Sequence, residues 1–138
     1  MSLNDESFGI RMAALTSVGR LAELNPAHVM PCLRKTLIQL LTEFEFAEGG
    51  RQAEQSALLL AKLVKASARL TGPYTAPIIE ALLRKLHSGR SNEQSMSRAC
   101  LIALGELAVV GGEVRACMMC VYALLSMSCL NVYFFQHT

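Results

Sequence analysis

The residues of this chain that could do chemistry are few and scattered. Cys117 and Cys120 form a C-x-x-C pair, a spacing found in zinc and thiol–disulfide sites. No second cysteine pair accompanies it, and His28, His87 and His137 are far apart in the sequence. On a helix the two thiols would share a face with apolar residues, so burial as small hydrophobic side chains is favoured over a zinc or redox role. We therefore expect no metal site and no cofactor.

Phosphate-binding and nucleophile motifs are also missing from the sequence. The glycine pairs 49–50 and 111–112 are isolated and do not form a glycine-rich phosphate loop. No histidine has a recognisable nucleophile pattern nearby, so each is expected to be an ordinary surface or rim residue. The methionines at 118, 119 and 127 are expected to belong to a core or an adhesive terminus. The sequence thus predicts no catalytic residue.

Composition indicates one modest intracellular domain. The chain has 138 residues, of which 52% are hydrophobic and 17% charged, with a net charge of +2. So small a positive charge gives no argument for binding nucleic acid. The first six residues are polar and acidic, unlike a secretory signal, and the count of five cysteines is odd. Both observations favour a reducing, cytoplasmic setting.

The chain also repeats itself. Three blocks share the order large apolar, very small, charged, leucine, apolar: Val18–Ala22, Leu60–Val64 and Leu104–Ala108. Their small residues, Gly19, Ala61 and Gly105, are 42 and 44 residues apart. A recurrence of about 40–47 residues with two helical patterns per unit is typical of helical-hairpin solenoids. We predict an all-α fold, an α-solenoid of about three antiparallel hairpins, with these small residues at buried helix crossings.

Apolar residues at helical spacing, together with proline and glycine signals, delimit the expected helices. By these signals five helices lie at about 6–24, 26–46, 52–67, 73–87 and 93–110. Pro26 suits a first helical turn, whereas Pro31 is expected to delay or bend the second helix. Ser91 and Gln94 have capping-box spacing ahead of the fifth helix.

The last segment differs from the rest of the chain. Residues 116–135 include no charged residue, over a length that could span a bilayer. Ser126, Ser128 and Asn131 interrupt the run and no basic cluster follows, which favours a sixth helix to about residue 128 over a membrane span. Its apolar side chains are expected to form an exposed patch that drives self-association and lowers solubility. The patch comprises Leu124, Leu125, Leu130, Tyr133, Phe134 and Phe135.

Several of these elements resemble a known family. Arg11, eight residues before Gly19, and the block Val18–Ala22 are similar to HEAT repeats. The string LNDESFGIRMAALTSVGRLAELNPAHVMPCLRKTLIQLLTEFE resembles the amino-terminal solenoid of the target of rapamycin kinases. The likeness continues in GRQAEQSALLLAKLV, RLTGPYTAPIIEALLRKL and IALGELAVVGG, weakens around residues 88–96, and fades after Arg115.

The resemblance implies HEAT-like repeats over residues 1–115 and a separate apolar segment at 116–138. The family's enzyme is a serine/threonine protein kinase, but its ATP- and metal-binding motifs have no match in this chain. What the resemblance implies is therefore a non-catalytic scaffold of growth signalling, cytoplasmic or peripheral on endomembranes. Its partners would be further solenoid repeats or subunits of a kinase complex.

Exposed polar residues on the expected helices form the candidate protein-contact surface. They are Arg20, Glu23, Arg34, Lys35, Lys62, Lys65, Arg84 and Lys85. The alternative for each is a charge that only solvates its helix. A second functional hypothesis is a membrane-anchored helical adaptor that uses residues 116–135 as its anchor. A small stand-alone enzyme finds no support beyond the three scattered histidines.

Overall fold

Helices make up the fold throughout the described part of the chain. The computed structural model describes residues 2–48, 50–88 and 94–110. Its five long helices are α1 (Phe8–Leu24), α2 (Pro26–Phe46), α3 (Gly50–Ala66), α5 (Thr75–Ser88) and α6 (Gln94–Val110). Three short helical turns are η1 (Ser2–Asn4), α4 (Ala68–Thr71) and η2 (Gly72–Tyr74). No strand occurs within these residues, in agreement with the all-α prediction.

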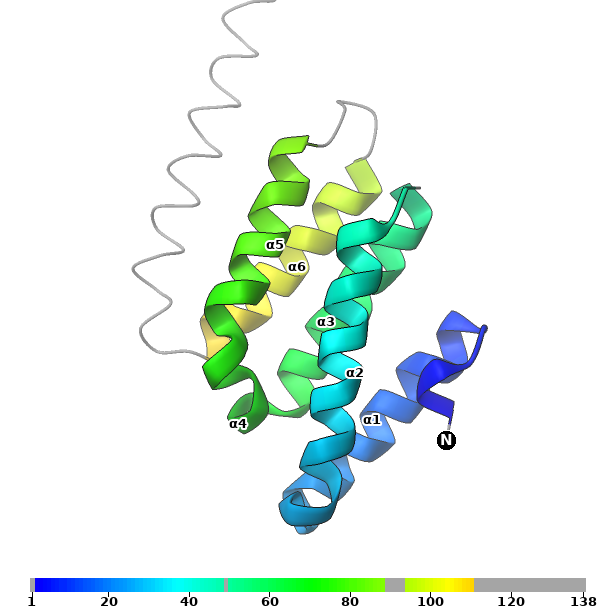
Figure 1. Ribbon diagram of the computed structural model, residues 1–138, viewed down its shortest axis with the longest axis vertical. Coiled ribbons are helices and arrows are strands. Elements are labelled where there is room, and N and C mark those ends of the chain that lie inside the picture. Colours follow the sequence, from blue (N-terminus) through cyan, green and yellow to red (C-terminus); the bar gives the residue numbers. More distant parts are fainter. Residues whose placement is uncertain (1, 49, 89–93, 111–138) are drawn as a thin grey trace, which may run out of the picture.

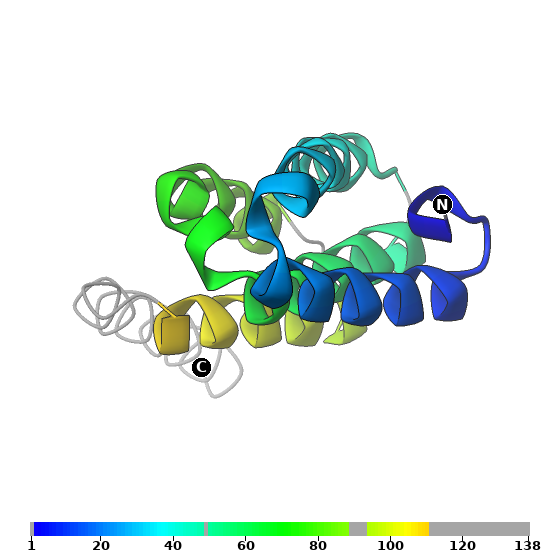
Figure 2. The ribbon, with the colours of Figure 1, turned by 90° about the horizontal axis from the view of Figure 1, so that it is seen from below.

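The long helices form two layers (Figures 1 and 2). Helices α1, α3 and α6 run in one direction in the first layer, and α2 and α5 run the opposite way in the second. Helix α3 packs against both α1 and α6, which have no substantial contact with each other. The described part therefore contains two antiparallel hairpins and the first helix of a third, which confirms the predicted solenoid.

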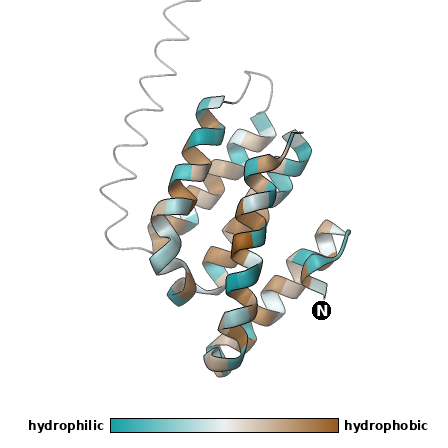
Figure 3. Ribbon diagram, in the orientation of Figure 1, coloured by the Kyte–Doolittle hydropathy of each residue, from teal (hydrophilic) through white to brown (hydrophobic). Residues whose placement is uncertain are grey.

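The core lies between the two layers and along α3. Leu33, Leu37 and Leu40 of α2 recur at helical spacing and are each at most 1% exposed. Leu60 and Val64 of α3 are fully buried because α1, α2 and α6 all pack against that helix. Apolar and polar residues are interspersed along the long helices (Figure 3). In α2, α3 and α5 the buried residues recur at helical spacing, as in amphipathic helices.

Two of the three predicted crossings are confirmed. A Cβ atom added to Gly19 would lie 2.5 Å from the Cβ of Ala66, so α1 and α3 meet with no room for a side chain. Ala61 is 5% exposed on α3. Gly105 is half-buried, and no heavy atom of the described residues lies within 4 Å of its absent Cβ. The crossing at Gly105 stays a prediction, because the residues that follow α6 lie outside the described part.

The helices depart from the expectation in two places. Helix α1 begins at Phe8 rather than residue 6, since the Oδ1 of Asp5 accepts a hydrogen bond from the Ser7 amide at 2.8 Å and holds a turn there. Pro31 lies inside α2 and does not delay its start. The backbone acceptor that Pro31 leaves without a helical donor belongs to Ala27, an exposed residue of the first turn where water can replace the lost bond.

The expectations for the end of the chain concern residues outside the described part. These are the sixth helix, the membrane-span alternative at 116–135, the apolar patch, and the Cys117–Cys120 pair. Ser91 of the expected capping box also lies outside it. Among the helices that are described, none combines the length and the apolar character needed to cross a membrane.

Candidate interaction surface

The eight predicted contact residues divide between the two layers. Arg20 and Glu23 lie on α1 and Lys62 and Lys65 on α3, all in the first layer. The other four lie on α2 and α5 in the second layer, and they are Arg34, Lys35, Arg84 and Lys85. The predicted set therefore forms separate groups in the structure and no continuous surface.

The first-layer group lines a shallow hollow of about 160 Å³ between α1 and α3. Arg20, Glu23, Lys62 and Lys65 line it together with Gly19. The repeat explains why these side chains lie close together. Arg20 and Lys62 directly follow the small residue of their helix, and Glu23 and Lys65 follow it by four positions. Both positions border the neighbouring helix of the layer. Three cations and one carboxylate line the hollow, and Glu106 of α6 stands beside Lys65 at its rim.

Equivalent positions of the repeat form an ion pair between the next two helices of the layer, α3 and α6. Lys65 follows Ala61 by four residues, and Glu106 follows Gly105 by one. Their Nζ and Oε1 atoms are 3.7 Å apart, with the lysine side chain 68% exposed. So exposed a pair contributes little stability, but it holds the lysine beside α6 at the rim of the hollow.

Lys85 is engaged within the fold. Its Nζ donates hydrogen bonds to the carbonyl oxygens of Glu45 at 3.3 Å and Ala47 at 3.0 Å, at the carboxyl end of α2. The same ammonium lies 5.6 Å from the centroid of the buried Phe44 ring. A cation at a helix carboxyl end satisfies unpaired carbonyls and the negative end of the dipole. Lys85 therefore joins the two second-layer helices.

Replacing Lys85 by methionine keeps the length of the side chain and removes its charge. We expect the free energy of unfolding to fall by about 1–2 kcal/mol, because the α2 carbonyls lose a charged donor. Urea unfolding would measure the change. Arg84→Met is the matched control: Arg84 pairs with Glu45 at 3.3 Å, but the two side chains are 61% and 51% exposed. That control should cost under about 0.5 kcal/mol, and equal losses in the two variants would contradict the assignment.

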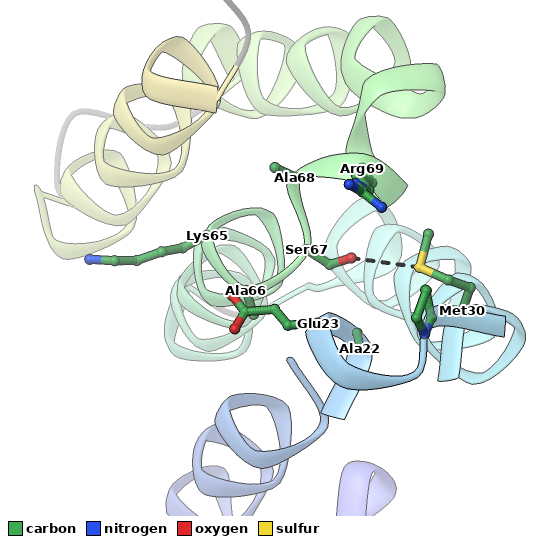
Figure 4. A pocket seen from close by; sticks show the side chains of 9 residues that line it. Ala22, Glu23, Met30, Lys65, Ala66, Ser67, Ala68 and Arg69 are labelled. Carbon is green, nitrogen blue, oxygen red and sulfur yellow. Dashed lines mark hydrogen bonds between the residues drawn. The ribbon is translucent and has the colours of Figure 1, made fainter. Parts of the chain in front are cut away.

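A larger hollow of about 320 Å³ opens where α1 turns into α2 and α3 turns into α4. The Oγ of Ser67 donates a hydrogen bond to the Sδ of Met30 at 3.8 Å across it (Figure 4). Glu23 and Arg69 also border the hollow, whereas the Lys65 side chain extends away from it. The hydroxyl of Ser67 is already bonded to Met30, and the rest of the lining combines small apolar residues with the charged Glu23, Lys65 and Arg69.

One polar cluster was not predicted as an interaction between helices. The Arg11 Nε donates to the Leu3 carbonyl oxygen at 3.2 Å, and its Nη2 contacts the Glu43 Oε2 at 2.8 Å. Gln39 donates to the other oxygen of Glu43 at 2.9 Å. The cluster ties η1, α1 and α2 together. Arg11 is part of the resemblance to HEAT repeats, but no pattern in the sequence predicts its ion pair with Glu43, 32 residues away.

The described histidines do not form a site. His28 and His87 are exposed on different helices, and the His87 Nδ1 lies 2.7 Å from the Leu83 carbonyl oxygen of its own helix. Within the described ranges no three histidine, cysteine or acidic residues come together in a way that could hold a metal ion. Cys100 is fully buried, and its thiol donates a weak hydrogen bond to the Met96 sulfur at 3.7 Å.

Burial raises the pKa of the Cys100 thiol to about 11, and the nearby charge of Lys85 lowers it only in part. The thiolate is the disfavoured form, so this group contributes stability below about pH 9 that is lost as the pH rises towards about 11. We expect iodoacetamide at about pH 8 to leave Cys100 unmodified in the native chain and to label it in urea. Peptide mass spectrometry reads out the site, and native labelling as fast as in urea would contradict the prediction.

Comparison with known proteins gives a consistent result. The serine/threonine-protein kinase tor1 of Schizosaccharomyces pombe is 49% identical over 113 residues, which make up 82% of this chain. TOR2 of Saccharomyces cerevisiae is 43% identical over 113 residues. This chain is homologous to a segment of the TOR kinases. The target of rapamycin homolog of Caenorhabditis elegans is more distant, at 36% identity over 112 residues. No family model matches the chain.

The shared segment is a small part of each TOR kinase. The chain spans 5% of the length of tor1 and 4% of the length of TOR2. The resemblance read from the sequence is thereby confirmed, and the helical architecture agrees with a solenoid segment.

Proposed function

We propose that this chain is a non-catalytic, protein-interaction scaffold: a HEAT-like solenoid segment of a TOR-type kinase system. The repeated step from α1 to α3 to α6, with Gly19 set against Ala66 at its first crossing, carries the proposal. Stacked hairpins of this kind present extended surfaces to other proteins. The homology to one short stretch of much longer kinases supports the same role.

The proposed contact surface is the cationic hollow between α1 and α3. Three cations and one carboxylate line it, so an acidic face of another protein would gain more from docking there than a neutral one. Arg34 and Lys35 are exposed on α2 and offer a second, separate cationic area. The partners in this proposal are further solenoid repeats or subunits of a kinase complex, in the cytoplasm or at endomembrane surfaces.

A chimeric kinase tests this role directly. In the S. pombe tor1 kinase, the matching segment would be replaced by residues 3–115 of this chain. We expect the chimera to accumulate at the parental level, and Lys62→Glu with Lys65→Glu to change which subunits co-purify with it. Arg51→Glu, an exposed cation of α3 outside the hollow, is the matched control and should change nothing. Identical subunit recovery for all variants would overturn the assignment of the hollow.

Within this proposal the chain has no enzymatic activity of its own. We expect the purified protein, incubated with Mg-ATP and a generic protein substrate, to transfer no phosphoryl group above the buffer blank. The reason is the lack of the lysine and the two aspartate motifs that position ATP and its metal ions. Transfer that a substitution within this chain abolished would overturn the prediction, whereas transfer unaffected by such substitutions would indicate a co-purified kinase.

A further inference from the structure

Met30 and Ser67 join two consecutive hairpins through a hydrogen bond to sulfur. Met30 lies in α2, the second helix of the first hairpin, and Ser67 lies between α3 and α4. The Oγ of Ser67 donates to the Sδ of Met30 at 3.8 Å, across the hollow where the two hairpins meet (Figure 4). A thioether is a weak acceptor, so the hydroxyl has a poor partner. Ser67 is 7% exposed, which leaves that hydroxyl little access to water as an alternative.

The Met30 side chain borders a space that small polar molecules can enter. It is half-buried and lines the hollow of about 320 Å³. A water molecule takes up about 30 Å³ in the liquid, and hydrogen peroxide is only slightly larger, so peroxide fits beside the thioether. The other two methionines of the described residues lie in different surroundings. Met96 is 1% exposed, and Met12 is half-buried against the hydrophobic core.

The surroundings of Met30 also suit the oxidised side chain. In methionine sulfoxide the sulfur carries an oxygen, which makes the side chain polar and a much stronger acceptor than the thioether. The Ser67 hydroxyl lies where it can donate to that oxygen, and Arg69 lines the same hollow with further N–H donors. Met96 is the opposite case, because its sulfur lies in the core beside the Cys100 thiol, a weak donor at 3.7 Å.

We propose that Met30 is a modification site, at which hydrogen peroxide converts the thioether to a sulfoxide that Ser67 holds by a hydrogen bond. The sulfur lone pair attacks one peroxide oxygen, and the S–O bond forms as the O–O bond breaks. The proton of the attacked oxygen passes to the leaving hydroxide, so that the sulfur is oxidised and the peroxide is reduced to water. Because Ser67 bonds the side chain in both forms, the two hairpins stay joined after oxidation and the hollow gains a polar acceptor.

Peptide mass spectrometry of the native full chain tests the reactivity. Trypsin separates the three described methionines, since Met12, Met30 and Met96 fall in peptides 12–20, 21–34 and 91–98. In dilute hydrogen peroxide we expect Met30 to be oxidised at least about tenfold faster than Met96, because a fully buried sulfur reacts only when the fold opens. In urea the two rates should be alike. Native oxidation of Met30 as slow as that of Met96 overturns the proposal, and so do fragment spectra in which the oxygen lies on Cys32 and not on Met30.

Urea unfolding of the oxidised chain tests the role of Ser67. The parent and Ser67→Ala proteins would be unfolded before and after the same peroxide treatment, with circular dichroism to check each fold. We expect oxidation to lower the unfolding midpoint of the parent little and that of Ser67→Ala clearly more, because the sulfoxide then lacks its buried donor. Equal shifts in the two proteins overturn the proposal.

Two further variants make the comparison specific. Ser56→Ala removes another buried hydroxyl of α3, at a residue that is 3% exposed, and should respond to oxidation like the parent. In the double variant Met30→Leu with Ser67→Ala the extra shift should disappear, and its persistence would assign the effect to another methionine and overturn the proposal. The rate comparison uses the unchanged chain, so it decides the proposal even if Ser67→Ala fails to fold.

Discussion

Substituting Gly19 by leucine is expected to lower the free energy of unfolding by about 3 kcal/mol, the upper part of the range for overpacked cores. A bare Cβ at this position would lie 2.5 Å from the Ala66 Cβ and 3.3 Å from the Ala66 Cα and carbonyl oxygen. Since two of the three obstructing atoms are backbone, α1 and α3 must move apart to admit a side chain. Urea or thermal unfolding followed by circular dichroism would measure the loss.

Gly9 provides the control on the same helix. No heavy atom of the described residues lies within 4 Å of its Cβ position, so Gly9→Ala should raise the free energy of unfolding by up to about 1 kcal/mol through helix propensity. Gly19→Ala gains the same propensity and should nevertheless destabilise the fold. Ala66→Gly combined with Gly19→Ala should restore part of the loss, since it removes the nearest atom. A Gly19→Leu variant as stable as the parent would mean that the helices do not cross here.

Truncating Phe44 to alanine should lower the free energy of unfolding by about 3–5 kcal/mol. The ring is completely buried near the carboxyl end of α2, and the Lys85 ammonium lies over it at 5.6 Å. The variant loses the transfer free energy of the ring, leaves a cavity between the layers, and removes the surface on which Lys85 rests. Denaturant unfolding at neutral pH would measure the sum of these losses.

Phe46 is a matched control two residues further along α2. Its side chain is 75% exposed, so Phe46→Ala should change the free energy of unfolding by less than about 0.5 kcal/mol. The two variants delete the same atoms from the same helix and differ in burial alone. Comparable losses for Phe44→Ala and Phe46→Ala would show that α2 is rotated about its axis relative to this description.

Periodic features of the fold were predictable from the sequence. Leu33, Leu37 and Leu40 recur at helical spacing, and that spacing alone identifies the buried face of α2. The small residues at Gly19 and Ala61 share a position in the repeat and were both expected at crossings. Gly105 shares that position too, and its crossing stays a prediction because the residues after α6 lie outside the described part.

Contacts between layers could not be read from the sequence. Lys85 reaches carbonyls at Glu45 and Ala47, about 40 residues earlier in the chain, and it was expected at an exposed contact surface. Its actual role depends on the distance between α2 and α5, which no periodicity encodes. The hollow between α1 and α3 was only partly predictable. The repeat gives the positions of Glu23 and Lys62 on their helices, but that the two side chains lie close together follows only from the crossing of the helices.

Helix α3 touches α1 and α6 while those two have no substantial contact, and this arrangement bears on how the chain acquires its structure. Packing partners in the first layer are one repeat apart, at steps of 42 and 44 residues between equivalent positions, and no contact in this layer joins its first helix to its third in a substantial way. The loops that close during folding therefore span one repeat and not the whole chain. A chain leaving the ribosome could complete α1, α2 and α3 in order of synthesis, without waiting for a distant segment. The Lys85 bonds then form late and join a hairpin that has just emerged to one already in place.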